Sequence, residues 1–372
     1  MLVEIYAMKK QDYPNVLKRI QDGDLEALKS LLAQSDDPSF ISSCQHAPSG
    51  DTAAIVAARN GRSETLELLY RKGVDLEKRN KDGKRPLHEA ASAGSLECVQ
   101  FLISKGVEID CLKRADWTPL MMACTKSNLF IIKELIAAGA SAHRCNKDGW
   151  NSFHIAAREG HQDILQYFLE EFPMIWRSKS KNGRTPLHTA AFHGNEQAVK
   201  LMIDRCQYEA DEKDSCGATP LMDALRSGHI RVAKHLIDGH GASLVTCDVL
   251  GRQPIHLVAQ AGCLDTMEFL VELHDVDPTI AVKSTGRTAL HIAAKEGHND
   301  IVQYLGCYGV CIDAQDRHKR TALHLCSASG HAECASKLLH LGADPTLKDC
   351  NGHTPMELSI NISVREVFES HR

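Results

Sequence analysis

The chain has 372 residues, which by length alone suggests two or three globular domains, and a formal net charge of −5. This mild acidity argues against affinity of the whole molecule for nucleic acid, and no run of residues is long and apolar enough to predict a membrane span. The 14 cysteines are scattered singly without any Cys-x-x-Cys pair, and the first ten residues lack a secretory pattern. We therefore expect a soluble intracellular protein with reduced thiols, no metal site and no cofactor.

The N-terminal part predicts a pair of helices over residues 12–34. In the second of them, Leu25, Leu28 and Leu32 fall on one face. This pair lacks the sequence word that marks every later unit, so we interpret it as an N-terminal capping unit. Residues 35–51, which contain prolines and a glycine, predict an irregular and mobile loop.

Residues 52–352 repeat one helix-starting word about every 33 residues. In residues 184–194 it reads Arg-Thr-Pro-Leu-His-Thr-Ala-Ala-Phe-His-Gly. The Thr can accept a hydrogen bond from a free helix N–H, Pro suits the first helical position, and Gly fits a left-handed helix end. The fourth residue of the tetrapeptide falls, at steps of 33 to 35, on Ile55, His88, Met121, His154, His188, Met222, His256, His291, His324 and Glu357. Such short helices cannot bury their apolar side alone, so the copies must stack.

A second helix and an extended finger follow each first helix. Turn dipeptides such as Asp82-Gly83 and Asp148-Gly149 predict a tight turn at each fingertip. Because stacked helices lie about 8–10 Å apart, we expect the fingers to form a continuous ribbon along one edge and the first helices to line a concave face. Residues 353–372 predict a C-terminal capping repeat and tail, with a helix that begins at Thr354.

This period, with Thr-Pro-Leu-His and Ala-Ala-x-x-Gly, resembles the ankyrin repeat family. The resemblance implies an all-α solenoid of helix pairs with β-hairpin-like fingers, about eleven units including the caps. No catalytic grouping or phosphate-binding loop interrupts the repeats, so we do not expect an enzyme. The six tetrapeptide histidines recur once per repeat, and we therefore interpret them as structural groups that hydrogen-bond near the next finger, not as metal ligands.

Four adjacent fingers are basic. Residues 77–85, 111–116, 143–150 and 177–184 carry charges of +3, +1, +1 and +4, although the chain is acidic. The basic residues that we predict to contact a partner are Lys78, Arg79, Lys81, Lys84, Lys113, Arg114, Arg144, Arg177, Lys179, Lys181 and Arg184. An electropositive ribbon favours docking on an acidic protein surface, a phosphate or a nucleic acid. The alternative is that these charges are simply solvated.

Two tryptophans occupy one register of this region. Trp117 and Trp150 precede the tetrapeptide position by the same distance, where other repeats mostly carry Lys or Arg. Aromatic side chains beside arginines are typical of binding hot spots. We therefore add both to the predicted contact surface, while the alternative is that each ring only packs on its own finger. Trp176, at the expected end of the following second helix, lies in the same zone.

Several segments of this region depart from the repeat consensus: residues 84–92, 115–125, 146–156 and 205–209. They resemble a member of the ankyrin repeat family that binds the catalytic domain of alanyl-tRNA synthetase. The resemblance implies a cytoplasmic and nuclear protein that prevents serine mischarging of alanine tRNA by capturing misactivated serine on lysine side chains. A generic adaptor for another protein, or a tRNA-binding ribbon, are the alternatives; we expect a monomer in each case.

The resemblance also implies which side chains capture serine. One acceptor position of that relative falls on Lys147, and the other two fall on Arg114 and Arg177. A guanidinium stays protonated and is not a useful nucleophile. Capture would therefore depend on Lys147, with Lys113 and Lys179 as alternative acceptors.

Overall fold

The computed structural model describes residues 15–33, 41 and 44–371, and these residues form two compact units that divide between Lys181 and Asn182. Each unit is built from pairs of short helices. The described residues form no strand beyond two isolated bridges. The predicted all-α class is therefore confirmed, and each unit is described below by itself.

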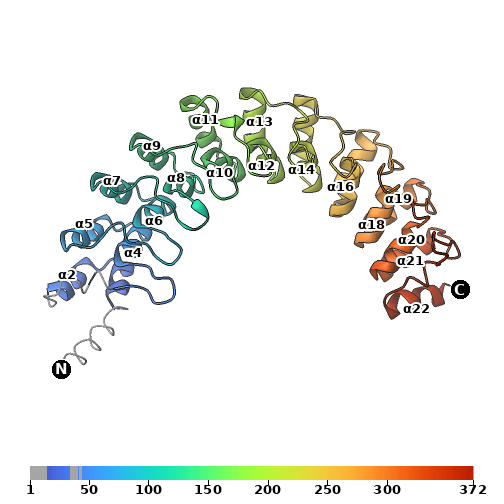
Figure 1. Ribbon diagram of the computed structural model, residues 1–372, viewed down its shortest axis with the longest axis horizontal. Coiled ribbons are helices and arrows are strands. Elements are labelled where there is room, and N and C mark those ends of the chain that lie inside the picture. Colours follow the sequence, from blue (N-terminus) through green and yellow to red (C-terminus); the bar gives the residue numbers. More distant parts are fainter. Residues whose placement is uncertain (1–14, 34–40, 42–43, 372) are drawn as a thin grey trace. The chain divides into compact units, whose positions relative to one another are not determined.

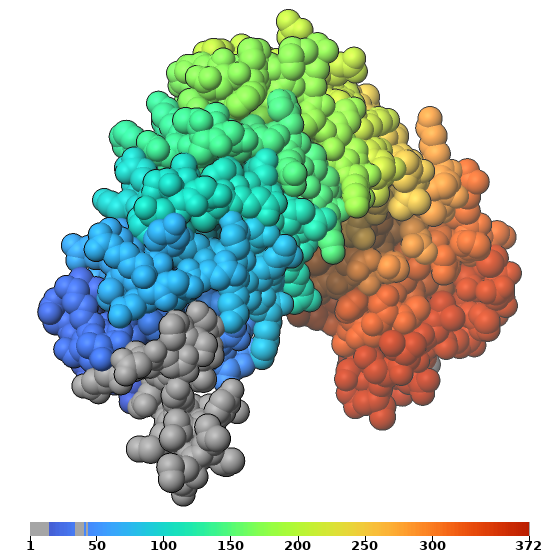
Figure 2. All heavy atoms as spheres, turned by 60° about the vertical axis from the view of Figure 1, so that its left-hand side comes forward, coloured from blue at the N-terminus to red at the C-terminus, as the bar shows by residue number. Residues whose placement is uncertain are grey.

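The first unit contains two rows of helices. After a helical stretch at 15–22, its helices are α2 (Leu25–Ala33), α4 (Ala53–Arg59), α5 (Ser63–Arg71), α6 (Pro86–Ala93), α7 (Leu96–Ser104), η1 (Arg114–Asp116), α8 (Pro119–Ala123), α9 (Leu129–Ala137), α10 (Ser152–Glu159), α11 (Gln162–Glu171) and η2 (Ile175–Arg177). The first helices α4, α6, α8 and α10 pack on one another in succession, and α5, α7 and α9 form the second row (Figure 1). In the space-filling view these repeats, coloured blue to green, follow one another as adjacent layers (Figure 2).

The second unit repeats this arrangement. Its helices are α12 (Pro186–Phe192), α13 (Glu196–Arg205), α14 (Pro220–Arg226), α15 (Ile230–Lys234), η3 (His235–Gly239), α16 (Pro254–Ala261), α17 (Leu264–Glu268), η4 (Phe269–Leu273), α18 (Ala289–Glu296), α19 (Asn299–Tyr308), α20 (Ala322–Ser329), α21 (Ala332–His340) and α22 (Ile362–Ser370). Here η3 and η4 are single π-helical turns that continue α15 and α17. They lie in repeats that are 34 and 35 residues long.

The two ends of the repeat array differ from its centre. In α2, Leu28 and Leu32 are buried and Leu25 is half-buried. Residues 12–14, 34–40, 42 and 43, which belong to the predicted cap and loop, lie outside the described residues. At the other end the helix predicted from Thr354 is reduced to a turn at 355–358, because Asn361 starts a new helix, accepting from the Val364 N–H at 3.0 Å.

The first helices begin and end as the repeated word predicts. Thr118 Oγ1 accepts from the Met121 N–H at 3.2 Å, and Pro119 occupies the first helical position. Gly94 ends α6 in the left-handed conformation, with φ of 79°. A capping side chain and a proline thus mark the start of α8, and a glycine that readily adopts a positive φ marks the end of α6.

The tetrapeptide histidines are buried structural links between one repeat and the next. His88 Nε2–H donates to Trp117 O at 3.1 Å, and its Nδ1 accepts from the Arg85 N–H at 3.2 Å. This pattern requires the neutral ring, and burial lowers the pKa of His88 to about 4. The same bond to the next finger joins His188 to Ala218 O, His256 to Ile280 O, His291 to Arg320 O and His324 to His353 O, at 3.0 to 3.2 Å. The predicted hydrogen bond to the next finger is confirmed for these five histidines.

A second set of histidines covers the helix-ending glycines. The His229 ring lies over Gly194, where an added Cβ would come within 2.6 Å of Nδ1, and its Nε2–H donates to Phe192 O at 3.1 Å. His298 and His331 cover the preceding repeats' glycines in the same way. In the sequence, these histidines stand directly after a helix-ending glycine and predict only the start of a second helix. The sequence feature that could have predicted this contact is the recurrence of a His, one repeat later, at the position that follows the helix-ending Gly.

Candidate functional site

The fingers of the first unit lie side by side, joined by backbone hydrogen bonds. The Arg114 N–H donates to Asp82 O at 2.7 Å, the Lys147 N–H to Ala115 O at 3.0 Å, and the Lys181 N–H to Asp148 O at 2.9 Å. Each bond links the tip of one finger to the tip of the finger before it. The expected row of adjacent tips is therefore present from residue 80 to residue 181.

Gly149 allows two of these fingers to approach closely. Its φ is 82°, and an added Cβ would lie 2.6 Å from Lys181 N. The turn is closed by the Asn146 N–H, which donates to Trp150 O at 2.8 Å. A side chain at position 149 would force the fingers apart, so the Asp-Gly turn sets the spacing of the tips as well as their conformation.

Most cations of these fingers are exposed. The exposed ones are Arg79, Lys81, Arg114, Arg144, Lys147, Arg177, Lys179 and Lys181, while Lys78 and Lys113 are half-buried. We call these ten residues the basic ribbon. Asp82 and Asp148 are exposed on the same tips, and Arg144 Nε lies 3.4 Å from Asp110 Oδ2. Positive charge remains in excess along the row, which favours an anionic partner.

Two predicted contact residues instead belong to internal ion pairs. Lys84 Nζ lies 2.7 Å from the buried Glu89 carboxylate, which also accepts from Arg59 at 2.9 Å. Although burial raises the pKa of Glu89, the hydrogen bonds from Arg59 and Lys84 outweigh it and hold this pKa below its usual value. In the second unit, Arg184 pairs with Asp223 at 2.5 Å. The charge of +9 counted from the sequence therefore exceeds the charge that a partner can meet.

Asp223 shows how strongly such carboxylates are buried. Its side chain has no exposure to solvent, and burial raises its pKa to about 6 against the opposing effect of Arg184 and Arg226. Arg226 lies 3.1 Å from the other carboxylate oxygen. Lys84 and Arg184, which hold the same position before the tetrapeptide, are thus both engaged in ion pairs within the chain.

Trp117 and Trp150 are half-exposed on two of the fingers that carry the basic ribbon. Lys113 Nζ lies 5.1 Å from the Trp117 ring centroid, and the Trp150 ring stacks on His154 at 6.1 Å. Each indole is held by its own repeat and still presents surface to solvent. Trp176, by contrast, lies in η2 and is buried, so it adds nothing to this surface.

The three lysines predicted to be serine acceptors have different surroundings. Lys147 and Lys179 are exposed, and the backbone of Lys147 is fixed by its bond to Ala115 O. Lys113 is half-buried, and burial, followed by the charge of Lys84, lowers the pKa of its ammonium. A lower pKa increases the neutral fraction that can act as a nucleophile.

Models of ankyrin repeats match nearly the whole chain. A three-copy model matches residues 18–113, 107–174, 173–248 and 240–316, and a single-repeat model matches residues 318–350. The chain belongs to the ankyrin repeat family. It is accordingly a scaffold of protein-binding repeats, a kind of module that is generally non-catalytic.

Curated relatives match only short parts of this ankyrin repeat chain. It is 28% identical over 99 residues to transient receptor potential cation channel subfamily A member 1 of Drosophila melanogaster, covering 26% of this chain and 8% of the channel. It is 49% identical over 51 residues to protein phosphatase 1 regulatory subunit 12A of Mus musculus, covering 14% of this chain and 5% of the subunit. The chain thus spans less than a tenth of either relative.

A solved structure supports the fold. The crystal structure of the human ASB11 ankyrin repeat domain matches with a TM-score of 0.52 and 23% sequence identity, covering 59% of this chain and 97% of that one. Among the described residues, no helix is both long and apolar enough to cross a membrane.

Proposed function

We propose that the basic ribbon, with Trp117 and Trp150, binds the catalytic domain of alanyl-tRNA synthetase and thereby limits serine mischarging of alanine tRNA. The observation that carries the proposal is the presence of two half-exposed indoles beside a row of exposed cations on linked fingers. The choice of partner rests on the resemblance of residues 84–92, 115–125 and 146–156 to ankyrin repeat domain-containing protein 16. The proposed setting is the cytoplasm and nucleus, with the chain acting as a monomer.

Serine capture needs only an amine and an activated acyl group. The neutral amine nitrogen attacks the carbonyl carbon of seryl-adenylate, an amide bond forms, the acyl–phosphate bond breaks, and AMP leaves while a proton passes to solvent. An unperturbed Lys with a pKa near 10.4 is only about one part in a thousand neutral at physiological pH. Docking beside the synthetase site would offset this by raising the local concentration. The lysine is consumed, so no turnover is involved.

The structure favours two acceptors for different reasons. Lys147 is exposed on a fingertip whose backbone is held by the neighbouring finger. Lys113 is less exposed, but the pKa of its amine is lowered. We therefore propose Lys147 as the primary acceptor, Lys113 as the more readily deprotonated alternative, and Lys179 as the third.

Binding is tested with the purified catalytic domain. We expect the double variant Trp117→Ala and Trp150→Ala to weaken binding by at least about 30-fold, because hot-spot indoles contribute on the order of 2 kcal/mol or more. Phe130→Ala is the matched control: this ring is 74% exposed on α9 of the same unit but lies outside the basic ribbon. Equal affinity of the double variant and the control would remove the two indoles from the interface, provided that circular dichroism shows native helix content.

Capture is tested by mass spectrometry after incubation with synthetase, ATP and serine. We expect seryl adducts on Lys147, their loss in Lys147→Arg, and unchanged adducts in the control Lys126→Arg, which alters an exposed lysine at the α8–α9 turn. Binding without any adduct would leave the docking role in place and exclude scavenging.

The same surface supports a second function, tRNA binding, because several exposed cations follow one another on adjacent tips. A salt-dependence measurement with isolated alanine tRNA separates the two. A steep decline in affinity between 50 and 200 mM salt, roughly a thousandfold for six or more phosphate contacts, would favour tRNA. Binding to neither molecule would favour an adaptor for another protein.

A further inference from the structure

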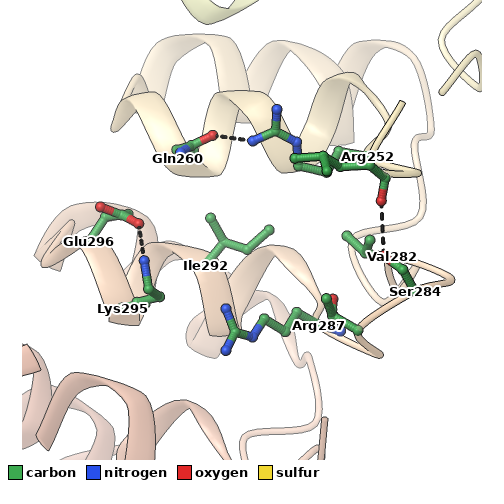
Figure 3. A pocket seen from close by; sticks show the side chains of 10 residues that line it. Arg252, Gln260, Val282, Ser284, Arg287, Ile292, Lys295 and Glu296 are labelled. Atoms are coloured by element: carbon green, nitrogen blue, oxygen red, sulfur yellow. Dashed lines mark hydrogen bonds and ion pairs between the residues drawn. The ribbon is translucent and has the colours of Figure 1, made fainter. Parts of the chain in front are cut away.

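A pocket of about 250 Å³ opens in the second unit. Two adjacent fingers and the first helices α16 and α18 line it (Figure 3). Leu250, Val282 and Ile292 provide an apolar part. Arg252, Arg287 and the Lys295–Glu296 pair surround it with polar groups. The pocket therefore offers both an aliphatic contact and positive charge.

The fingertip beside this pocket is unusually apolar. Val249 and Leu250 occupy the two tip positions and are 69% and 56% exposed. The corresponding pairs in other repeats include Lys81-Asp82, Lys147-Asp148, Lys181-Asn182, Ser215-Cys216 and Cys350-Asn351. Placing two aliphatic side chains in water at a position that readily accepts polar residues indicates a contact surface. Ser284 Oγ donates to Leu250 O at 3.0 Å, which fixes this tip to the next finger.

The two arginines differ in how fully they are occupied. Arg252 is held by Asp248 at 2.7 Å and by Gln260 Oε1 at 2.7 Å. Arg287 has one long bond, from Nε to Asp316 Oδ2 at 3.4 Å, and Asp316 also accepts from Arg320. Figure 3 shows the Arg252 and Arg287 side chains on either side of Ile292. Arg287 is therefore the arginine better able to bind a carboxylate of a partner.

We propose that this pocket and the tip Val249–Leu250 form a second docking site, for an extended segment of a partner protein that carries an aliphatic side chain next to an Asp or Glu. The aliphatic group would contact Leu250, Val282 and Ile292. The carboxylate would bind the Arg287 guanidinium, whose planar N–H groups suit two parallel bonds. The site does not depend on the function proposed for the first unit, and the two sites together would let one chain hold two proteins.

The test uses a phage-displayed library of random dodecapeptides, selected on the full chain. We expect enrichment of peptides with Leu, Ile or Val within two residues of Asp or Glu. Selection on Leu250→Ser should lose these peptides, and selection on Val245→Ser should retain them. Val245 is the matched control, because it is 66% exposed on the same finger but does not line the pocket.

An enriched peptide, labelled with fluorescein, then allows affinities to be compared by anisotropy. We expect Arg287→Gln to weaken binding at least tenfold, while Asp316 keeps its bond from Arg320 and the thermal transition is unchanged. Lys319→Gln, on the next finger, should bind as the unaltered chain does. Failure to enrich any acidic–aliphatic motif, or equal binding by Leu250→Ser and Val245→Ser, would overturn the proposal without affecting synthetase binding.

Discussion

The buried His88 predicts a specific loss of stability in mild acid. Its pKa is about 4 in the folded chain, against an ordinary value of 6.5. Because the pKa of this histidine is lower in the folded chain than in the unfolded chain, its contribution to the free energy of unfolding is fully present above pH 6.5. That contribution is lost as the pH falls towards 4. At pH 5 the unfolded ring is almost fully protonated and the folded ring is about one-tenth protonated. The difference amounts to about 2 kcal/mol of unfolding free energy between pH 7 and pH 5.

Urea unfolding followed by tryptophan fluorescence measures this loss, because Trp117, Trp150 and Trp176 all lie in the first unit with His88. The comparison is with His88→Gln, whose amide can still donate to Trp117 O but does not titrate. We expect the variant to be less stable at pH 7 and to lose about 2 kcal/mol less than the unaltered chain on going to pH 5.

Other titrating groups, such as Asp110 with its pKa raised by burial, are common to both proteins. The difference between the two proteins therefore isolates the contribution of His88, provided that the slope of free energy against urea is the same in both. If the free energy of unfolding changed with pH equally in the two proteins, the conclusion that His88 is buried as a neutral ring would be refuted.

Two further predictions concern packing. Gly194→Ala should destabilise the second unit by about 2–4 kcal/mol, because it combines a positive φ with a clash against His229. The control Gly241→Ala has a similar φ but no neighbour within 4 Å, and it should cost about 1 kcal/mol. Thermal melts followed by circular dichroism compare the two variants. Glu89→Gln should cost about 2 kcal/mol in urea unfolding, because it leaves two cations without their buried carboxylate, whereas Glu97→Gln on the exposed side of α7 should stay within about 0.5 kcal/mol. Equal effects within either pair would contradict the packing described here.

The repeated word made much of the fold predictable. Local rules suffice for Thr118, Pro119 and Gly94, because a cap, a fixed φ and a left-handed end depend on the residue itself and its near neighbours. The histidine link was predictable from its recurrence, since a histidine that returns at the same position in six repeats is expected to have the same structural role in each. What local rules do not give is a contact such as that of His229 with Gly194, which forms across 35 residues.

The candidate site was less predictable for the same reason. A charge count along one finger assumes that Lys84 and Arg184 are surface groups. Their ion-pair partners, however, lie on first helices: Glu89 in the same repeat as Lys84, and Asp223 one repeat after Arg184. Burial of Trp176 likewise follows from the short helix η2, which no periodicity in the sequence marks. The apolar tip at Val249 could have been found by comparing the fingertips with one another.

The measurement that tests the account most directly is hydrogen–deuterium exchange of the full chain, alone and bound to the catalytic domain of alanyl-tRNA synthetase. The account predicts slower exchange in peptides covering residues 111–118 and 143–151, and unchanged exchange in those covering residues 243–253. Unchanged exchange in the first two peptides of a saturated complex would contradict docking through the basic ribbon.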